Sequence, residues 1–408
     1  MNRRVAITGA AGISPLGNSW AAVRDRLKQY HNAVNIIEDW TQYEGLNSNL
    51  GAEAAPFDVP AHFDRKTTRS MGRVALMATI TAEQALIDAG LLNDPIVTDG
   101  RMGIAYGSSS GSPSALAEFL RMLTNKRTEG INATTYIKMM SHTAAVNIGV
   151  YLGVKGRVIP TSSACTSGSQ GVGYAYEAVK SGKQVAMIAG GAEELDVTQV
   201  AIFDTLFATS VKNSAPNTTP RPFDCARDGL VLGEGAGTLI LEEYEHAVAR
   251  GARIYAEIVG FGTNSDGTHI TRPNSLMMQA AMRLALEDAA LPPEAVGYVN
   301  GHGTATDHGD IAESQATLAV FGSSTPISSL KSYMGHTLGA CGSLEAWMSV
   351  EMMRDDWFAP TLNLTDVDPR CAPLDYIVGE GRRVQCEYVA SNNFAFGGIN
   401  TSLVFKRV

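Results

Sequence analysis

One cysteine and two histidines of this chain stand in settings that suit covalent catalysis. Cys165 lies in TSSACTSGSQGVG, where an apolar strand-like stretch gives way to a helix-like one. A thiol at a helix N-terminus faces the positive end of the helix dipole and free N–H groups, which favour the thiolate. Those N–H groups can also stabilise the oxyanion that forms when a sulfur attacks an acyl carbonyl. Cys165 is therefore a candidate nucleophile, and a buried structural cysteine is the alternative.

The two histidines follow apolar strand-like stretches in the second half of the chain. His302 lies in YVNGHGTATDHGD, and the glycines on both sides let a substrate approach the imidazole closely. His336 lies in SSLKSYMGHTLGACG, just before a helix-like stretch whose dipole disfavours the imidazolium. These matching settings predict that both imidazoles share one site with Cys165, whereas each histidine alone could be a structural polar residue.

Two other kinds of site are disfavoured by the sequence. A zinc site is the rival for one cysteine and two histidines, but these are far apart in sequence and no short paired spacing occurs. No metal site is assigned. The stretch TGAAGISPLG near the N-terminus lacks the GxGxxG spacing of a dinucleotide-binding turn.

The elements that must position these residues alternate between strands and helices. Strand-like stretches occupy residues 3–9, 101–107, 155–160, 184–194, 252–262 and 295–300, and helix-like stretches occupy residues 70–90, 169–182, 277–291 and 338–353. In the first helix Val74, Met77, Ile80 and Ile87 are expected on one face, with Gly90 as the C-cap. The C-terminal residues 388–408 read as two strands around a Gly-Gly loop. This alternation predicts an α/β fold with largely parallel sheets, in two similar halves that meet near residue 250.

Composition excludes several classes of function. The 408 residues are 45% hydrophobic and carry a net charge of −9, which disfavours nucleic-acid binding. The five cysteines form no CxxC pair, so neither a disulfide framework nor a zinc ribbon is expected, and a reducing cytoplasm is favoured. No run of about 18 apolar residues predicts a membrane span.

Five motifs in order along the chain resemble the β-ketoacyl-acyl carrier protein synthase II family. They are SSACTSG around Cys165, RPFDCARDGLVLGEGAG at residues 221–237, NGHGTATDHGD around His302, KSYMGHTLGACGSLEA around His336, and NNFAFGGIN near the C-terminus. The resemblance covers essentially the whole chain. It implies a thiolase fold, in which duplicated βαβαβαββ halves form a layered α-β-α-β-α body, here residues 1–250 with the cysteine and residues 251–408 with the histidines.

The resemblance also implies roles for individual residues. Cys165 accepts an acyl group as a thioester, and His302 and His336 assist decarboxylation of a malonyl group carried by an acyl carrier protein. The N–H groups of Cys165 and Phe396 form an oxyanion hole. The pair Lys331 and Glu345 supports the histidines, Thr304 and Thr306 bind the phosphopantetheine arm, and Phe396 with Gly397 gates the acyl pocket. No cofactor is required, although the resemblance allows a structural monovalent cation near Asn300, Glu345 and Asn392.

This chain departs from the family pattern at several positions. Asp307 and His308 stand where a proline and an aliphatic residue are usual, which makes the entrance more polar. Ser110 aligns with a large aliphatic residue that closes the acyl pocket, so a longer or unusual chain is expected. These changes favour a polyketide or aryl-polyene pathway over bulk fatty-acid synthesis.

The implied partners are an acyl carrier protein and a second subunit. Candidate docking residues are Arg65, Lys66, Arg69, Arg73, Lys126 and Arg127, a basic patch that would offset the repulsion between two acidic proteins. Phe207 replaces an arginine that the family often has for docking. A homodimer is expected, with a heterodimer with a chain-length partner as the alternative.

Two other functions compete with an elongating synthase. A non-catalytic chain-length subunit of the same fold usually lacks the nucleophile, whereas Cys165 is present. A degradative thiolase has a second cysteine near the C-terminus, where this chain has Phe396, and Cys386 lies ten residues earlier.

Overall fold

A mixed sheet of eleven strands runs through the computed structural model, which describes residues 3–408. The strand order is β13-β11-β10-β15-β16-β9-β1-β8-β6-β4-β5. The bounds are β1 Val5–Ile13, β4 Met102–Gly107, β5 Val158–Thr161, β6 Ala186–Glu193, β8 Gly235–Glu243, β9 Ala256–Ser265, β10 Val296–Asn300, β11 Pro326–Ser328, β13 Asp375–Tyr376, β15 Tyr388–Phe394 and β16 Ile399–Lys406.

The two halves of this sheet repeat one connection pattern. In β5-β4-β6-β8-β1 the first two pairings are parallel and the last two antiparallel. The order β11-β10-β15-β16-β9 repeats this arrangement of directions. The duplicated thiolase-type fold expected from the sequence is therefore confirmed, while a domain boundary at residue 250 stays a prediction. The expectation of largely parallel sheets is wrong, because strands such as β15 and β16 are joined by a short turn instead of a helical crossover.

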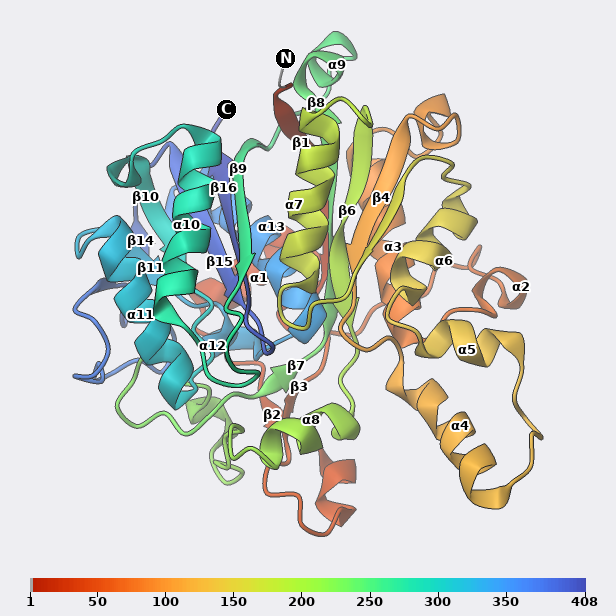
Figure 1. Ribbon diagram of the computed structural model, residues 1–408, viewed down its shortest axis with the longest axis horizontal. Helices are drawn as coiled ribbons and strands as arrows, with labels where there is room; N and C mark the ends of the chain where they lie inside the picture. The colour runs from red at the N-terminus through yellow and green to blue at the C-terminus, as the bar shows by residue number, and fades with distance from the viewer. Residues whose placement is uncertain (1–2) are drawn as a thin grey trace.

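The helices form three layers around the two halves. The middle layer consists of α7 (Ser167–Lys180) and α13 (Cys341–Arg354), which contact strands of both halves. The N-terminal half is covered by α3 (Arg73–Asp88) and α6 (Thr143–Leu152), and the C-terminal half by α10 (Ser275–Ala289) and α11 (Asp307–Phe321). Figure 1 shows this layered α-β-α-β-α arrangement, with α7 between the two groups of strands.

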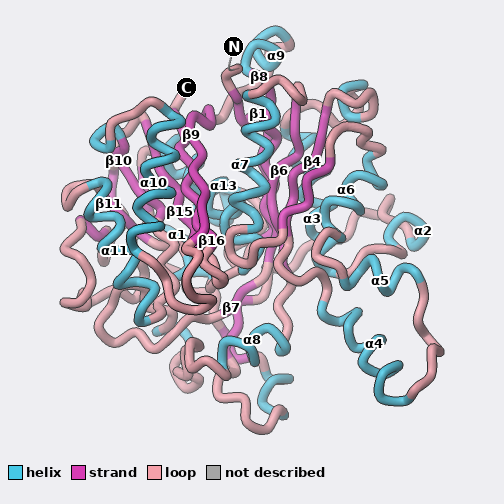
Figure 2. The backbone as a smooth tube through the Cα atoms, viewed as in Figure 1, coloured by secondary structure: helices cyan, strands magenta, loops and turns pink. Residues whose placement is uncertain are grey.

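The remaining elements lie around this body. The helices are α1 Trp20–Lys28, α2 Arg65–Thr68, α4 Pro113–Asn125, α5 Ala133–Met139, α8 Val197–Asp204, α9 Tyr244–Ala249 and α12 Lys331–Met334. Two small sheets contain β2 Asn35–Ile36, β3 Leu50–Ala52 and β7 Leu232–Gly233, and β12 Trp357–Phe358 with β14 Arg382–Arg383. Figure 2 shows α8 and β7 at one end of the main strands and α4 projecting to the side. No helix within residues 3–408 has the length and apolar character needed to cross a membrane.

The burial of helix α3 agrees with its sequence pattern at most positions but not at all of them. Val74, Met77 and Ile80 are buried as predicted, and Gly90 has the positive φ of +69° that suits a helix C-terminus. Ile87, however, is 58% exposed. At 3.6 residues per turn it lies only about 20° around the helix from the buried Ile80, but two turns later, in the last turn of α3. The prediction that it shares the buried face was therefore wrong at that position.

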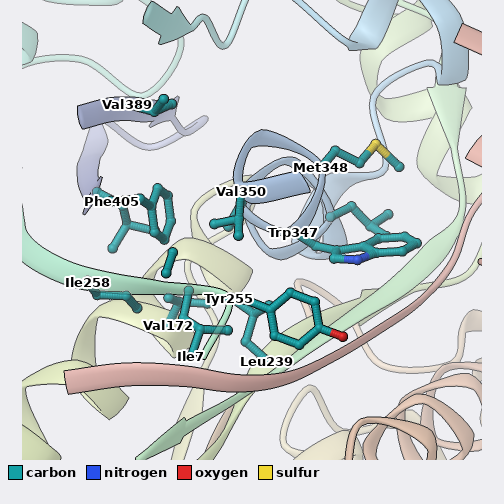
Figure 3. Packing of buried hydrophobic residues seen from close by; sticks show 14 of the residues in the cluster. Ile7, Val172, Leu239, Tyr255, Ile258, Trp347, Met348, Val350, Val389 and Phe405 are labelled. Atoms are coloured by element: carbon teal, nitrogen blue, oxygen red, sulfur yellow. The ribbon is translucent and has the colours of Figure 1, made fainter. Parts of the chain in front are cut away.

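The main hydrophobic core joins the two halves through the middle layer. Figure 3 shows Ile7 and Leu239 of the first half and Phe405 of the second half near Val172 of α7 and Val350 of α13. The core thus holds α7 and α13, whose first turns follow Cys165 and His336, in fixed positions.

Two glycines allow the middle helices to approach each other. A Cβ atom at Gly168 would lie 2.8 Å from the carbonyl oxygen of Gly339, and one at Gly342 would lie 2.6 Å from the backbone nitrogen of Ser169. These separations are shorter than van der Waals contact, so a side chain at either position would push the helices apart.

Candidate active site

Cys165 lies in the sharp turn that joins β5 to α7. Ala164, just before it, has a φ of +52°, and α7 begins at Ser167. The side chain is only 4% exposed. The backbone N–H groups of Phe396 and of Cys165 itself point toward the sulfur. The turn therefore places a thiol beside N–H donors of the kind that an oxyanion hole needs.

His302 follows β10 and is held by a carboxylate that the sequence analysis did not identify. The Oε1 and Oε2 atoms of Glu313, on α11, accept hydrogen bonds from the backbone N–H groups of His302 (2.6 Å) and Gly303 (2.7 Å). Burial raises the pKa of Glu313 to about 8. An acidic residue eleven positions after His302 carries no spacing signal, because a turn and a helix separate the two.

His336 is positioned by the backbone on both sides of it. Its N–H donates to the carbonyl oxygen of Val231 at 2.7 Å, and its Nδ1 accepts from the N–H of Leu338 at 3.2 Å. Because Nδ1 accepts, the ring proton lies on Nε2. Among residues 3–408, Nε2 has no hydrogen-bond partner although it is buried, so this N–H is available to a substrate.

The structure brings these three residues together at one end of a pocket. The sulfur of Cys165 and one ring nitrogen each of His302 and His336 all lie within 4.8 Å of one another. The two imidazole rings are 5.1 Å apart and perpendicular, at 89°. A pocket of about 420 Å³ reaches all three residues from the surface.

Burial decides the protonation states in this site. It holds the pKa of both His302 and His336 well below the ordinary value, and the charge of Lys331 adds to the effect. Both rings are therefore neutral N–H donors at neutral pH. Burial also raises the pKa of the Cys165 thiol, opposed by the N–H of Phe396 and by Lys331. The thiolate-favouring helix terminus inferred from the sequence is thus outweighed by burial, which sequence could not reveal.

Behind the histidines lies a fully buried ion pair. The Nζ of Lys331 is 2.5 Å from Oε1 of Glu345, and the two side chains are 1% and 0% exposed. Burial alone would lower the pKa of Lys331, but the Glu345 carboxylate outweighs it and raises this pKa. The Nδ2 of Asn393 donates to Oε2 of Glu345 at 2.7 Å. The motif NNFAFGGIN by itself indicates no role for Asn393. Nor does the sequence signal Cys341, whose thiol donates to the carbonyl oxygen of Cys165 at 3.2 Å.

The pocket wall contains most of the other predicted residues. Thr304 and Thr306 line it, and their hydroxyls are 2.8 Å apart. Phe396 is 36% exposed and meets Phe203 edge to face, with ring centroids 6.0 Å apart. Gly397 follows with a φ of +93°.

Three residues at which the sequence departs from the pattern that it resembles lie at the entrance of the pocket. Phe207 is 88% exposed there. Asp307 and His308 lie at the start of α11, where Asp307 is paired with Arg370. The entrance thus combines an exposed aromatic ring with charged and polar groups.

Ser110 lies apart from this pocket. It is exposed, its hydroxyl accepts from Gln199 at 2.8 Å, and it donates to the buried carboxylate of Glu193. Its expected place at the end of an acyl pocket stays a prediction.

The predicted docking residues divide into two groups. Arg65, Lys66 and Arg69 are exposed on and just after α2, and Lys126 and Arg127 are exposed just after α4. Arg73 is also exposed, but its guanidinium is paired with Glu234, with N–O distances of 2.9 and 2.5 Å. Its part in docking stays a prediction.

Because native His336 is neutral, we expect the unfolding free energy of the protein to fall as pH falls. An unfolded histidine has a pKa of about 6.5. Below that pH the unfolded chain binds a proton at this position and native His336 does not, so stability is lost as pH falls. The His336→Asn variant keeps an acceptor near Nδ1 but cannot titrate. Between pH 7.5 and 5.5 the wild type should lose about 1.4 kcal/mol more unfolding free energy than this variant, measured by urea denaturation. Equal losses would show that buried His336 is protonated.

Comparison with known proteins agrees with this geometry. Residues 2–247 match the family model of the β-ketoacyl synthase N-terminal domain, and residues 255–365 match that of the C-terminal domain. The chain is 36% identical to 3-oxoacyl-[acyl-carrier-protein] synthase 2 of Synechocystis sp., over 99% of this chain and 98% of that one.

Solved structures give the same result. A β-ketoacyl synthase from Burkholderia phymatum is 59% identical, with a TM-score of 0.98 and full coverage of both chains. The ishigamide ketosynthase/chain length factor is 29% identical, with a TM-score of 0.90 and full coverage of both chains. With the cysteine and both histidines gathered at the end of a pocket in this fold, the chain belongs to the β-ketoacyl synthase family.

Proposed function

We propose that the protein is an elongating 3-oxoacyl-acyl carrier protein synthase, an acyltransferase that extends an acyl chain by two carbons. The observation that carries this proposal is the meeting of one thiol and two neutral imidazoles at the end of a single pocket. A nucleophile accounts for acyl transfer, and paired N–H donors account for stabilising an enolate.

In the first half-reaction the sulfur of Cys165 attacks the thioester carbonyl of an acyl carrier protein. The N–H groups of Cys165 and Phe396 hold the oxyanion as the C–S bond to the carrier breaks. The acyl group stays on Cys165 as a thioester, and the thiol proton leaves with the carrier thiol.

In the second half-reaction malonyl carrier protein occupies the same pocket. Its carboxylate leaves as carbon dioxide, and the electron pair forms an enolate whose oxygen accepts hydrogen bonds from His302 and His336. The carbanion attacks the acyl carbon on Cys165, the C–S bond breaks, and the Cys165 thiolate takes up a proton. The product is a 3-oxoacyl carrier protein.

The pocket wall and the buried ion pair have supporting roles in this proposal. Thr304 and Thr306 hydrogen-bond the phosphopantetheine arm, and Phe396 moves on the flexible Gly397 to admit the acyl chain. Lys331 and Glu345 hold the histidines in place. No cofactor enters any step, since phosphopantetheine carries both substrates.

Pathway, carrier docking and subunit composition complete the proposal. Ser110 is proposed to border a pocket for a long or unusual chain in a polyketide or aryl-polyene pathway. Docking of the acidic carrier is assigned to the patch Arg65, Lys66, Arg69, Lys126 and Arg127.

A homodimer is proposed, and the ishigamide ketosynthase, paired with a chain length factor, makes a heterodimer the alternative. Free cysteines favour the cytoplasm.

A structural monovalent cation beside the ion pair is also proposed. Within residues 3–408, the buried Oδ1 atoms of Asn300 and Asn392 have no hydrogen-bond partner, and the Nδ2 of Asn300 lies 3.5 Å from Oε2 of Glu345. Unpartnered amide oxygens near a carboxylate are the ligands that such cations prefer.

The function is tested by intact-mass analysis after incubation with acyl carrier proteins that carry chains of different lengths. The proposal expects one acyl adduct, mapped to Cys165, which disappears when malonyl carrier protein is added and yields a product two carbons longer. A protein that is never acylated alone but activates a second subunit would instead be a chain-length partner.

A further inference from the structure

The carboxamide of Asn393 lies between the buried ion pair and His302. Its Nδ2 is 2.7 Å from Oε2 of Glu345 and 3.4 Å from Nδ1 of His302. Asn393 is fully buried on β15, the strand that pairs with β10, which ends just before His302. The side chain therefore connects Glu345 directly to one of the two imidazoles.

The orientation of this amide follows from its partners. A buried carboxylate paired with Lys331 accepts hydrogen bonds and cannot donate, so the NH₂ group of Asn393 must face Glu345. That group carries two hydrogens, and the second is directed toward Nδ1 of His302. The sulfur of Cys341 is a competing acceptor at 3.8 Å, but it is farther away and accepts hydrogen bonds more weakly than an imidazole nitrogen.

A donor at Nδ1 determines where the proton of a neutral imidazole lies. If Nδ1 accepts, the proton must be on Nε2. The backbone N–H of Leu338 imposes the same state on His336. Two unrelated elements, a backbone N–H and the amide of Asn393, thus produce the same tautomer in both rings.

We propose that Asn393 is a positioning residue, which holds His302 as the Nε2–H tautomer so that both imidazoles donate to one substrate oxygen. This inference rests on the proposed function and assigns a cause to the donor geometry of that site. Besides the direct effect of the Lys331 charge on the histidines, the ion pair of Lys331 and Glu345 acts through Asn393, because Glu345 fixes the direction of its amide. The sequence alone gives Asn393 no such role.

The decisive variant is Asn393→Asp, which replaces a donor by an acceptor of the same shape. The Asp and Glu345 carboxyl groups, about 2.7 Å apart, retain one proton between them, and the Asp oxygen still offers a lone pair to Nδ1 of His302. The His302 proton is therefore drawn to Nδ1, and Nε2 presents a lone pair to the substrate unless the ring is protonated. The other titratable groups that surround His302 are Cys165, Glu313, Lys331, His336, Cys341 and Glu345, and all are retained in the variant.

The measurement is the rate of malonyl carrier protein decarboxylation, without an acyl donor, from pH 5.5 to 8.5. In Asn393→Asp the imidazolium still donates at low pH, and the rate should fall as pH rises, to about 100-fold below wild type at pH 8.5. Loss of packing alone would lower the rate by one factor at every pH, which would overturn the inference. Asn147→Asp, a buried amide on α6, is the control and should keep the wild-type profile.

A second variant covers the case in which a new buried acid prevents folding. Asn393→Leu adds no charge but removes the donor, so decarboxylation should fall about tenfold while acylation of Cys165, followed by intact mass, changes less than about threefold. Parallel loss of both reactions would refute a positioning role. A wild-type protein that neither becomes acylated nor decarboxylates malonyl carrier protein would refute the proposed function itself.

Discussion

Replacing Cys165 with alanine should abolish condensation but leave malonyl decarboxylation in place. Among residues 3–408, no second thiol lines the pocket, because Cys341 is buried behind the backbone of Cys165 and its thiol donates to the carbonyl oxygen there. Loss of a covalent nucleophile should lower the condensation rate by about 10⁴-fold or more. The donors that stabilise the enolate, His302 and His336, are untouched, so carbon dioxide should still be released.

The two reactions are separated by parallel assays of product formation and carbon dioxide release, with intact mass to detect any adduct. Cys371→Ala is the matched control, since Cys371 is another buried free cysteine outside this pocket. It should keep acylation and condensation. Condensation by Cys165→Ala at the wild-type rate would show that the sulfur is not the nucleophile.

Replacing Lys331 with methionine should destabilise the protein more than any change at its surface. The variant leaves the Glu345 carboxylate buried without the Lys331 ammonium group. Removing one partner of a buried ion pair costs about 3–5 kcal/mol of unfolding free energy. Denaturant unfolding measures the loss. Lys180→Met is the control, because Lys180 pairs with Asp288 at 2.5 Å but both side chains are partly exposed, and a pair of that kind contributes about 1 kcal/mol or less.

The double variant Lys331→Met with Glu345→Leu separates stability from catalysis. Removing both charges should restore most of the lost stability, since a buried ion pair is often replaceable by apolar side chains. Decarboxylation should remain low, because Asn393 then has no carboxylate to fix its orientation. Recovery of the full decarboxylation rate would show that the pair serves folding alone.

The sequence predicted the element order well where a local pattern existed. The C-terminal strands β15 and β16 around their Gly-Gly loop and helix α3 with its glycine cap appear as expected. The helices α4 and α5 were not identified, and the proportion of parallel pairing was overestimated. The proportion of parallel pairing depends on how distant strands pair, which local periodicity does not encode. Helix α4, in contrast, has a local signal, because Pro113 stands in its first turn and Leu116, Phe119, Leu120 and Leu123 recur at helical spacing.

The candidate site shows the same limit. Cys165, His302 and His336 could be found because each follows a strand and stands beside small residues. Glu313 and Asn393 could not, since each acts through contacts across 11 and 91 residues of chain. The protonation states also depend on burial, a property of the folded protein and not of the motif.

The close approach of α7 and α13 has a consequence for how such an enzyme can diversify. No side chain larger than hydrogen fits at Gly168 or Gly342. The contact between α7 and α13, which follow the thiol and one imidazole, therefore tolerates no substitution at these two glycines. Changes of substrate range are therefore expected away from this contact, for example at the pocket entrance, where Phe207 and Arg272 border the pocket and are exposed. Laboratory libraries aimed at altered selectivity should randomise the pocket entrance and keep Gly168 and Gly342 unchanged.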